Sequence, residues 1–164
     1  MTDNELDALL TLAEIAIGLA GFSAIVVLFK RGDAGTWRAA HSDRFTGMVV
    51  HAMAAALFGV LPLVVEVFAP QPSVLWVWCS GLLAVQVASH TGMVVWLAST
   101  GPSARAMVVL GGGAVVLLQG ANVFGIGLET GGGPYVVGVI WHLLHAGGLF
   151  IALVWIPADV IEDR

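Results

Sequence analysis

Charged residues are scarce in this chain. Only 10% of its 164 residues are Asp, Glu, Lys or Arg, whereas a soluble domain carries about 25%. Hydrophobic residues make up 59%, and the mean hydropathy is +0.95. Lipid must therefore be the solvent for most of the surface. The sequence predicts an integral membrane protein with a single transmembrane domain, residues 1–164.

Cysteine and dense basic runs are also lacking. Cys79 is the only cysteine, which excludes an intrachain disulfide and a cysteine metal cluster. The net charge of −5 gives no basic surface, so no nucleic-acid partner is expected. The Gly-x-Ser-x-Gly and His-Glu-x-x-His motifs are missing, and no enzyme activity is expected, although a redox role stays open. The acidic start, MTDNELD, indicates a retained helix rather than a secretory signal.

What the chain has in abundance is long apolar runs. A helix crosses the hydrocarbon core with roughly 20 residues. Five stretches meet that length, and clusters of Gly, Pro and Ser separate most of them. They run approximately over 6–29, 45–69, 74–98, 104–128 and 135–156. The runs lack the alternation of barrel strands, so the predicted fold is an all-α bundle of five transmembrane helices.

The basic residues fall on one side of this topology. With five spans, the 30–44 loop, the 99–103 loop and the C-terminus share a side, which holds all six Lys and Arg residues: Lys30, Arg31, Arg38, Arg44, Arg105 and Arg164. The positive-inside rule then predicts an external N-terminus and a cytoplasmic C-terminus.

The other side is acidic. Glu66 and Glu129 lie at its loops, with no Lys or Arg nearby in the sequence. Such a mouth would concentrate cations and repel anions. An equally good interpretation is that acidic ends assist translocation of the N-terminus.

Polar side chains recur on one face of each span. Polar groups in lipid are costly, so these faces are expected to point into the bundle or into a protein–protein interface. Depth counted along the spans spreads the polar residues across the membrane as a ladder rather than a compact cluster. This predicted polar ladder consists of Glu14, His51, Gln86, His90, Gln119, Asn122, His142 and His145.

Small residues and one proline accompany the ladder. Small residues permit close helix approach, and they occur at Ala13, Gly18 and Gly21 in the first span and at 111–114 in the fourth. Pro62 removes a backbone hydrogen bond and is expected to free a carbonyl near the middle of the second span.

Three functions fit these observations. Hydrogen-bonding groups at successive depths suit a small channel or transporter for protons or small cations. The same groups also suit hydrogen bonding between helices in a structural or accessory subunit, which would have no transport activity. A homo-oligomer is expected, because one short chain encloses little space, and an unidentified membrane partner is an alternative.

The third function is a haem- or metal-binding redox protein. His51 and His90, at similar depth on different spans, could bind a haem iron from both sides. His142 and His145 could bind a divalent metal with Glu14 as third ligand. Two histidines at i,i+3 specify neither, so the cofactor remains undetermined.

The two ends of the chain resemble a family of uncharacterised small bacterial polytopic membrane proteins. The segments are EIAIGLAGFSAIVVLF, with a Gly-Leu-Ala-Gly-Phe first helix, and GPYVVGVIWHLLHAGGLFIALVW, with Gly-Pro-Tyr leading into an aromatic-rich last helix. The resemblance implies a multi-pass protein of a bacterial inner (plasma) membrane and no activity. Members typically carry apolar or small residues at positions 142 and 145, so these histidines are a departure and receive no function from the family.

Overall fold

The chain folds into five α-helices. The computed structural model describes residues 1–32, 39–69, 71–97, 102–127 and 129–155. The helices are α1 (Asp3–Gly32), α2 (Ala39–Phe68), α3 (Pro72–Leu97), α4 (Pro102–Phe124) and α5 (Gly132–Trp155). Each is long and apolar enough to cross a membrane. The predicted all-α architecture of five spans is confirmed, and the chain is a multi-pass membrane protein.

The helix ends differ from the predicted span ends by several residues. α2 begins six residues earlier than Phe45, and α5 begins three residues earlier than Tyr135. α4 ends at Phe124 rather than Leu128, because Gly125 adopts a left-handed conformation (φ 63°). The amide of Ile126 then donates to the Ala121 carbonyl at 2.9 Å, as in a Schellman cap. Each residue of error moves a side chain by about 1.5 Å along the helix axis.

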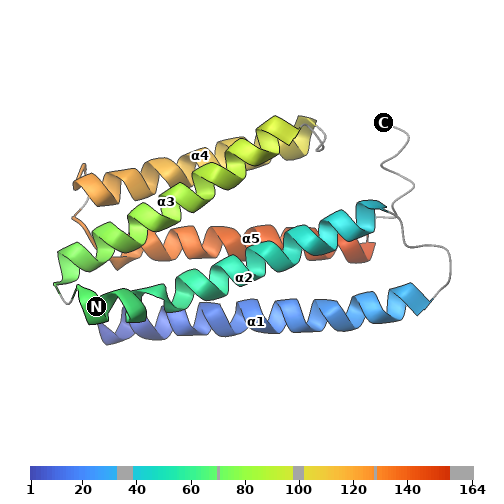
Figure 1. Ribbon diagram of the computed structural model, residues 1–164, viewed down its shortest axis with the longest axis horizontal. Helices are drawn as coiled ribbons and strands as arrows, with labels where there is room; N and C mark the ends of the chain where they lie inside the picture. Colours follow the sequence, from blue (N-terminus) through green and yellow to red (C-terminus); the bar gives the residue numbers. More distant parts are fainter. Residues whose placement is uncertain (33–38, 70, 98–101, 128, 156–164) are drawn as a thin grey trace.

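Successive helices run in opposite directions along the long axis of the bundle, and α5 lies in the middle of the arrangement (Figure 1). Among the described residues, α5 packs against each of the other four helices, whereas α1 contacts only α2 and α5. α3 pairs mainly with α4, and this pair diverges from α2 and α5 toward one end (Figure 1). We call this the basic end, because Arg44 and Arg105 lie near it, at the starts of α2 and α4. The opposite end, which carries Met1, is called the N-terminal end.

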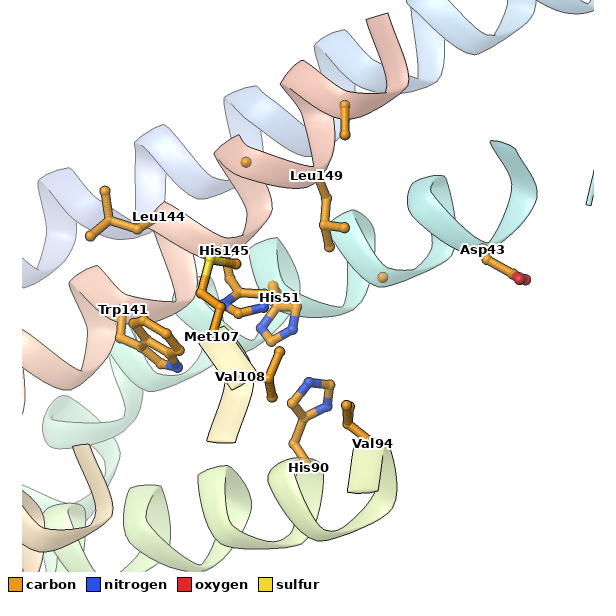
Figure 2. A pocket seen from close by; sticks show the side chains of 13 residues that line it. Asp43, His51, His90, Val94, Met107, Val108, Trp141, Leu144, His145 and Leu149 are labelled. Carbon is orange, nitrogen blue, oxygen red and sulfur yellow. The ribbon is translucent and has the colours of Figure 1, made fainter. Parts of the chain in front are cut away.

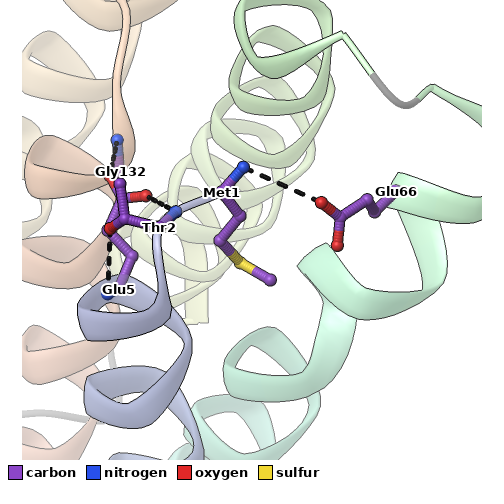
Figure 3. Close-up of polar contacts among 5 residues, drawn as sticks. All are labelled: Met1, Thr2, Glu5, Glu66 and Gly132. Atoms are coloured by element: carbon purple, nitrogen blue, oxygen red, sulfur yellow. Dashed lines mark hydrogen bonds and ion pairs between the residues drawn. The ribbon is translucent and has the colours of Figure 1, made fainter.

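Hydrogen bonds close the N-terminal end of the bundle (Figure 3). The Thr2 amide donates to the Glu5 carboxylate at 2.7 Å, and the Glu5 amide donates back to the Thr2 hydroxyl at 3.3 Å. This pair is a capping box that starts α1. The same Glu5 carboxylate accepts from the Gly132 amide at 3.2 Å, which ties the start of α5 to α1.

Two groups of buried apolar side chains form the core. The larger group lies in the half of the bundle next to the N-terminal end and includes Leu9, Trp76, Leu83, Tyr135 and Val139. The smaller lies toward the basic end around Met48, Ala52 and Ala146. The region between α2, α3 and α5 that separates them contains polar side chains.

Close helix approach depends on a subset of the small residues. A Cβ at Gly59 would lie 2.9 Å from the Cβ of Ala13, so α1 and α2 touch here as predicted for Ala13. Gly111 is also a close contact, since a Cβ there would overlap the Trp141 ring. Gly18 and Gly21, in contrast, are exposed, and a Cβ added at either would have nothing within 4 Å. No other helix of the described chain approaches these two glycines, so close approach at Gly18 and Gly21 stays a prediction for contact with another chain.

Candidate functional site: a histidine cluster at the floor of a cavity

Four histidines from three helices meet in the middle of the bundle. The His51 ring of α2 lies 4.5 Å, centroid to centroid, from both His90 of α3 and His145 of α5. The Nδ1 atoms of His51 and His142 are 3.0 Å apart, a hydrogen-bond distance. His51 is thus the centre of what we call the histidine cluster: His51, His90, His142 and His145.

This arrangement replaces part of the predicted ladder by a compact group. Depth counted along the predicted spans puts His142 in the half of the membrane nearer the predicted external side and His51 nearer the predicted cytoplasmic side. The true helix starts move both toward the middle, since α2 and α5 begin six and three residues before the expected ends. The crossing of α2, α3 and α5 then brings the rings into contact. The residue pattern of one helix does not predict such contacts between helices.

A cavity of about 430 Å³ leads to the cluster. Its lining includes His51, His90 and His145, with Trp141 and Met107 beside them (Figure 2). From the histidines it extends toward the basic end, where Asp43 and Ala152 also line it. Its volume lies within the range of ligand-binding cavities, about 300–1,000 Å³. The cluster therefore has a preformed approach from the basic end.

On the opposite side, the cluster meets closely packed groups. The ring of Phe58 stacks on that of His142, with centroids 6.2 Å apart and planes 6° apart. The His142 Nε2 atom is buried there without a hydrogen-bond partner. Beyond lies the larger core group, with Leu83 and Val139. Among the described residues, the cavity thus approaches the cluster from the basic end, and packed side chains lie on the opposite side.

Pro62 has the predicted effect. Proline has no amide hydrogen, so the carbonyl four residues earlier, that of Phe58, loses its helical partner. The Tyr135 hydroxyl of α5 donates to this carbonyl at 2.7 Å. Tyr135 is the only tyrosine in the chain and is fully buried. The freed carbonyl is consequently satisfied by a neighbouring helix.

Two further ladder residues, Gln119 and Asn122, hold the N-terminal end of α5. The Gln119 amide donates to the Pro134 carbonyl at 2.6 Å, while its Oε1 atom is buried without a partner. Asn122 bonds the turn before α5, donating to the Gly131 carbonyl and accepting from the Gly131 amide, both at 2.9 Å. It also donates to the Ser80 hydroxyl at 2.8 Å. Both side chains thus bond backbone groups at or just before the start of α5.

The last two ladder residues lie elsewhere. Gln86 is half-buried on α3, one turn before His90, and its Oε1 atom is buried without a hydrogen-bond partner. Glu14 is exposed on α1, outside the bundle interior. The polar face of α1 therefore does not point into the chain's own bundle, and the other predicted environment, a protein–protein interface, stays a prediction for this helix.

The acidic mouth is partly neutralised. The amino group of Met1 lies 3.7 Å from the Glu66 carboxylate (Figure 3), so Glu66 has a cationic neighbour that the count of Lys and Arg omits. Glu129 is exposed beside the α4–α5 turn. Among the described residues, no contact joins the carboxylates of Glu66 and Glu129 into one site.

The histidine geometry does not fit the proposed haem ligation. A macrocycle between two axial imidazoles needs an iron ligated on opposite faces. His51 and His90 instead contact each other edge to face at 83°, with centroids 4.5 Å apart, which leaves no space for a porphyrin. Glu14 is on the exterior and cannot join His142 and His145. Within the described ranges, no group of three or more His, Cys, Asp or Glu side chains is placed to hold a metal ion.

Several residues of the site were not identified from the sequence. Tyr135 could have been identified, because the carbonyl that Pro62 frees needs a hydrogen-bond donor from another helix and Tyr135 is the only tyrosine in the sequence. Trp141 and Met107 were indistinguishable from lipid-facing residues, since apolar side chains line both the cavity and the membrane surface. Asp43 lies in the first turns of α2, where charged residues are common near a membrane interface.

No family model, no curated protein and no solved structure matches this chain.

Proposed function

We propose that this protein moves protons or small cations across the membrane as a gated, transporter-like protein, with the histidine cluster as its proton-binding site. The observation that carries the proposal is the convergence of four histidines, three of which line a 430 Å³ cavity that extends toward the basic end. Ionisable groups inside membrane spans are functional candidates by default. A cavity that leads to such groups gives them a route of exchange.

The contacts within the cluster suit proton transfer. A neutral imidazole accepts a proton on one nitrogen and donates from the other. His90 and His145 line the cavity, His51 contacts both, and the Nδ1 atoms of His51 and His142 are 3.0 Å apart. A proton that enters from the cavity therefore has a continuous sequence of rings as far as His142.

Repulsion limits how many protons the cluster holds. Two charged rings 4.5 Å apart would repel by about 4 kcal/mol at an effective dielectric constant of about 20. One proton at a time is consequently favoured, and a second arriving proton would drive the first onward.

The packing beyond His142 favours a gated mechanism over an open pore. Phe58 covers the His142 ring, and the larger core group fills the N-terminal half. Passage to the N-terminal end requires this packing to rearrange. Alternating exposure of one central site is the behaviour of a transporter.

Proteoliposomes test the proposal. A potassium gradient with valinomycin sets the membrane potential, and an internal dye reports pH. Wild-type protein should acidify the lumen under an inward-driving potential, whereas His51→Ala should reduce flux to the level of empty liposomes. His90→Asn should also lower it, in case His51→Ala compromises folding.

His41→Ala is the matched control. His41 precedes His51 by ten residues on α2, about 15 Å along the helix axis, and its removal should leave flux unchanged. The proposal is overturned if wild-type protein shows no flux above empty liposomes, or if folded His51→Ala and His90→Asn proteins match the wild type.

A further inference from the structure

Glu14 lies near the middle of a transmembrane helix and faces away from its own bundle. The apolar span of α1 runs from Asp3 to Phe29, and Glu14 is two residues from its midpoint. The side chain is exposed, while the neighbouring Ala13 and Ala16 are buried against the rest of the chain. The carboxyl group thus points to whatever surrounds α1 at mid-membrane depth.

Lipid is a poor environment for this group. Half of the hydrocarbon core is about 15 Å thick, and a position two residues from the midpoint is displaced by only about 3 Å. A glutamate side chain is too short to cover the remaining distance to either interface. Intramembrane carboxyl groups accordingly face protein or a water-filled cavity.

The residues around Glu14 form a face suited to another helix. Thr11, Gly18 and Gly21 are spaced three, four and seven residues from Glu14 and lie on the same side of α1. All three are exposed, and a Cβ added at either glycine would meet nothing within 4 Å. Glycines on such a face let a second backbone approach closely. We call these four residues the α1 outer face.

We propose that a second copy of this chain covers the α1 outer face, with α1 packed against α1 and Glu14 of each copy bonded to the other. The chemistry is self-complementary. A protonated carboxyl group has one donor and one acceptor, so two identical groups related by a two-fold axis satisfy each other. The Thr11 hydroxyl, one turn away, supplies a further donor and acceptor on the same face. α1 is also the helix with the least buried span, which leaves the most surface for a partner.

This interface is independent of the proton pathway, because the histidine cluster lies on α2, α3 and α5 of a single chain. Loss of the dimer with retained flux, or the reverse, would therefore separate this inference from the proposed function.

Single-molecule photobleaching or energy transfer in lipid vesicles that contain only this protein tests the inference. Wild-type protein should be dimeric. Glu14→Leu, which suits lipid better, should shift the population to monomers, whereas Glu14→Gln retains hydrogen bonding and should remain dimeric. Leu117→Ala, at a residue 76% exposed on α4, is the control and should not alter the dimer.

Cross-linking locates the interface without relying on stability. In a Cys79→Ala background, Gly21→Cys should form a disulfide-linked dimer under mild oxidation, and Leu117→Cys should not. The inference is overturned by a monomeric wild type, by a Glu14→Leu protein that stays dimeric, or by cross-linking at position 117 in place of 21.

Discussion

The hydroxyl of Tyr135 donates a 2.7 Å hydrogen bond to the carbonyl of Phe58, the acceptor that Pro62 leaves without a helical partner. This bond joins α5 to α2 directly beside the ring of His142, on which Phe58 stacks. It fixes the position of the two helices that supply three of the four histidines.

Tyr135→Phe should lower the free energy of unfolding by about 1–2 kcal/mol, because a buried carbonyl loses its only donor. In a Pro62→Ala background the helix supplies its own amide to Phe58, and the same substitution should cost clearly less. Unfolding in mixed micelles of the two single variants and the double variant gives the coupling. Equal costs in both backgrounds would show that the hydroxyl does not act on this carbonyl.

The 3.0 Å contact between two Nδ1 atoms constrains the protons of His51 and His142. One of the two nitrogens must carry a hydrogen for the other to accept. We therefore expect at least one histidine with a protonated Nδ1, which ¹⁵N chemical shifts of histidine-labelled protein in bilayers report directly. His142→Asn should remove that signal pattern. Spectra with every ring hydrogen on Nε2 would contradict the contact.

Asn122 is expected to matter for stability rather than transport. Its side chain makes three hydrogen bonds, one to Ser80 and two to Gly131. Asn122→Ala should destabilise the protein by about 2–3 kcal/mol, and Ser80→Ala, which removes one bond, by about 1 kcal/mol. Proton flux per folded molecule should be unchanged in both. Loss of flux in a stably folded Asn122→Ala protein would return this residue to the transport pathway.

Gly111 gives a way to obstruct the cavity without touching the histidines. A methyl group there overlaps the Trp141 ring, which lines the cavity and lies 4.9 Å from the His145 ring. Gly111→Ala should displace the indole and reduce proton flux. Gly113→Ala on the same helix meets nothing within 4 Å and should behave as wild type. If the two variants conduct equally, the wall that Trp141 forms does not control access.

The sequence predicted the architecture well because the physical signal is strong. Apolar runs of about 20 residues, interrupted by Gly, Pro and Ser, have few alternatives to membrane helices. The effect of Pro62 was also predictable, since a missing amide hydrogen has a local and certain consequence. The partner of the freed carbonyl, Tyr135, comes from 77 residues away and was not.

The candidate site was only partly predictable. Seven of the eight ladder residues have side chains that are buried or half-buried, whereas Glu14 is exposed. Helical periodicity identifies residues that share a face, yet it does not tell which neighbour covers that face. For α1, the face that carries Glu14 lies outside the chain's own bundle.

The sequence by itself thus determined the number of spans, their apolar character and the residues available for chemistry, because these follow from the local cost of placing backbone and polar groups in lipid. Only the tertiary structure decided which polar residues meet. The sequence predicts the depth of each polar side chain along its own helix to within a few residues, and each residue of error shifts that depth by about 1.5 Å. The lateral crossing of α2, α3 and α5 is set by side-chain packing between helices, and it turned a predicted ladder into a histidine cluster beside a cavity.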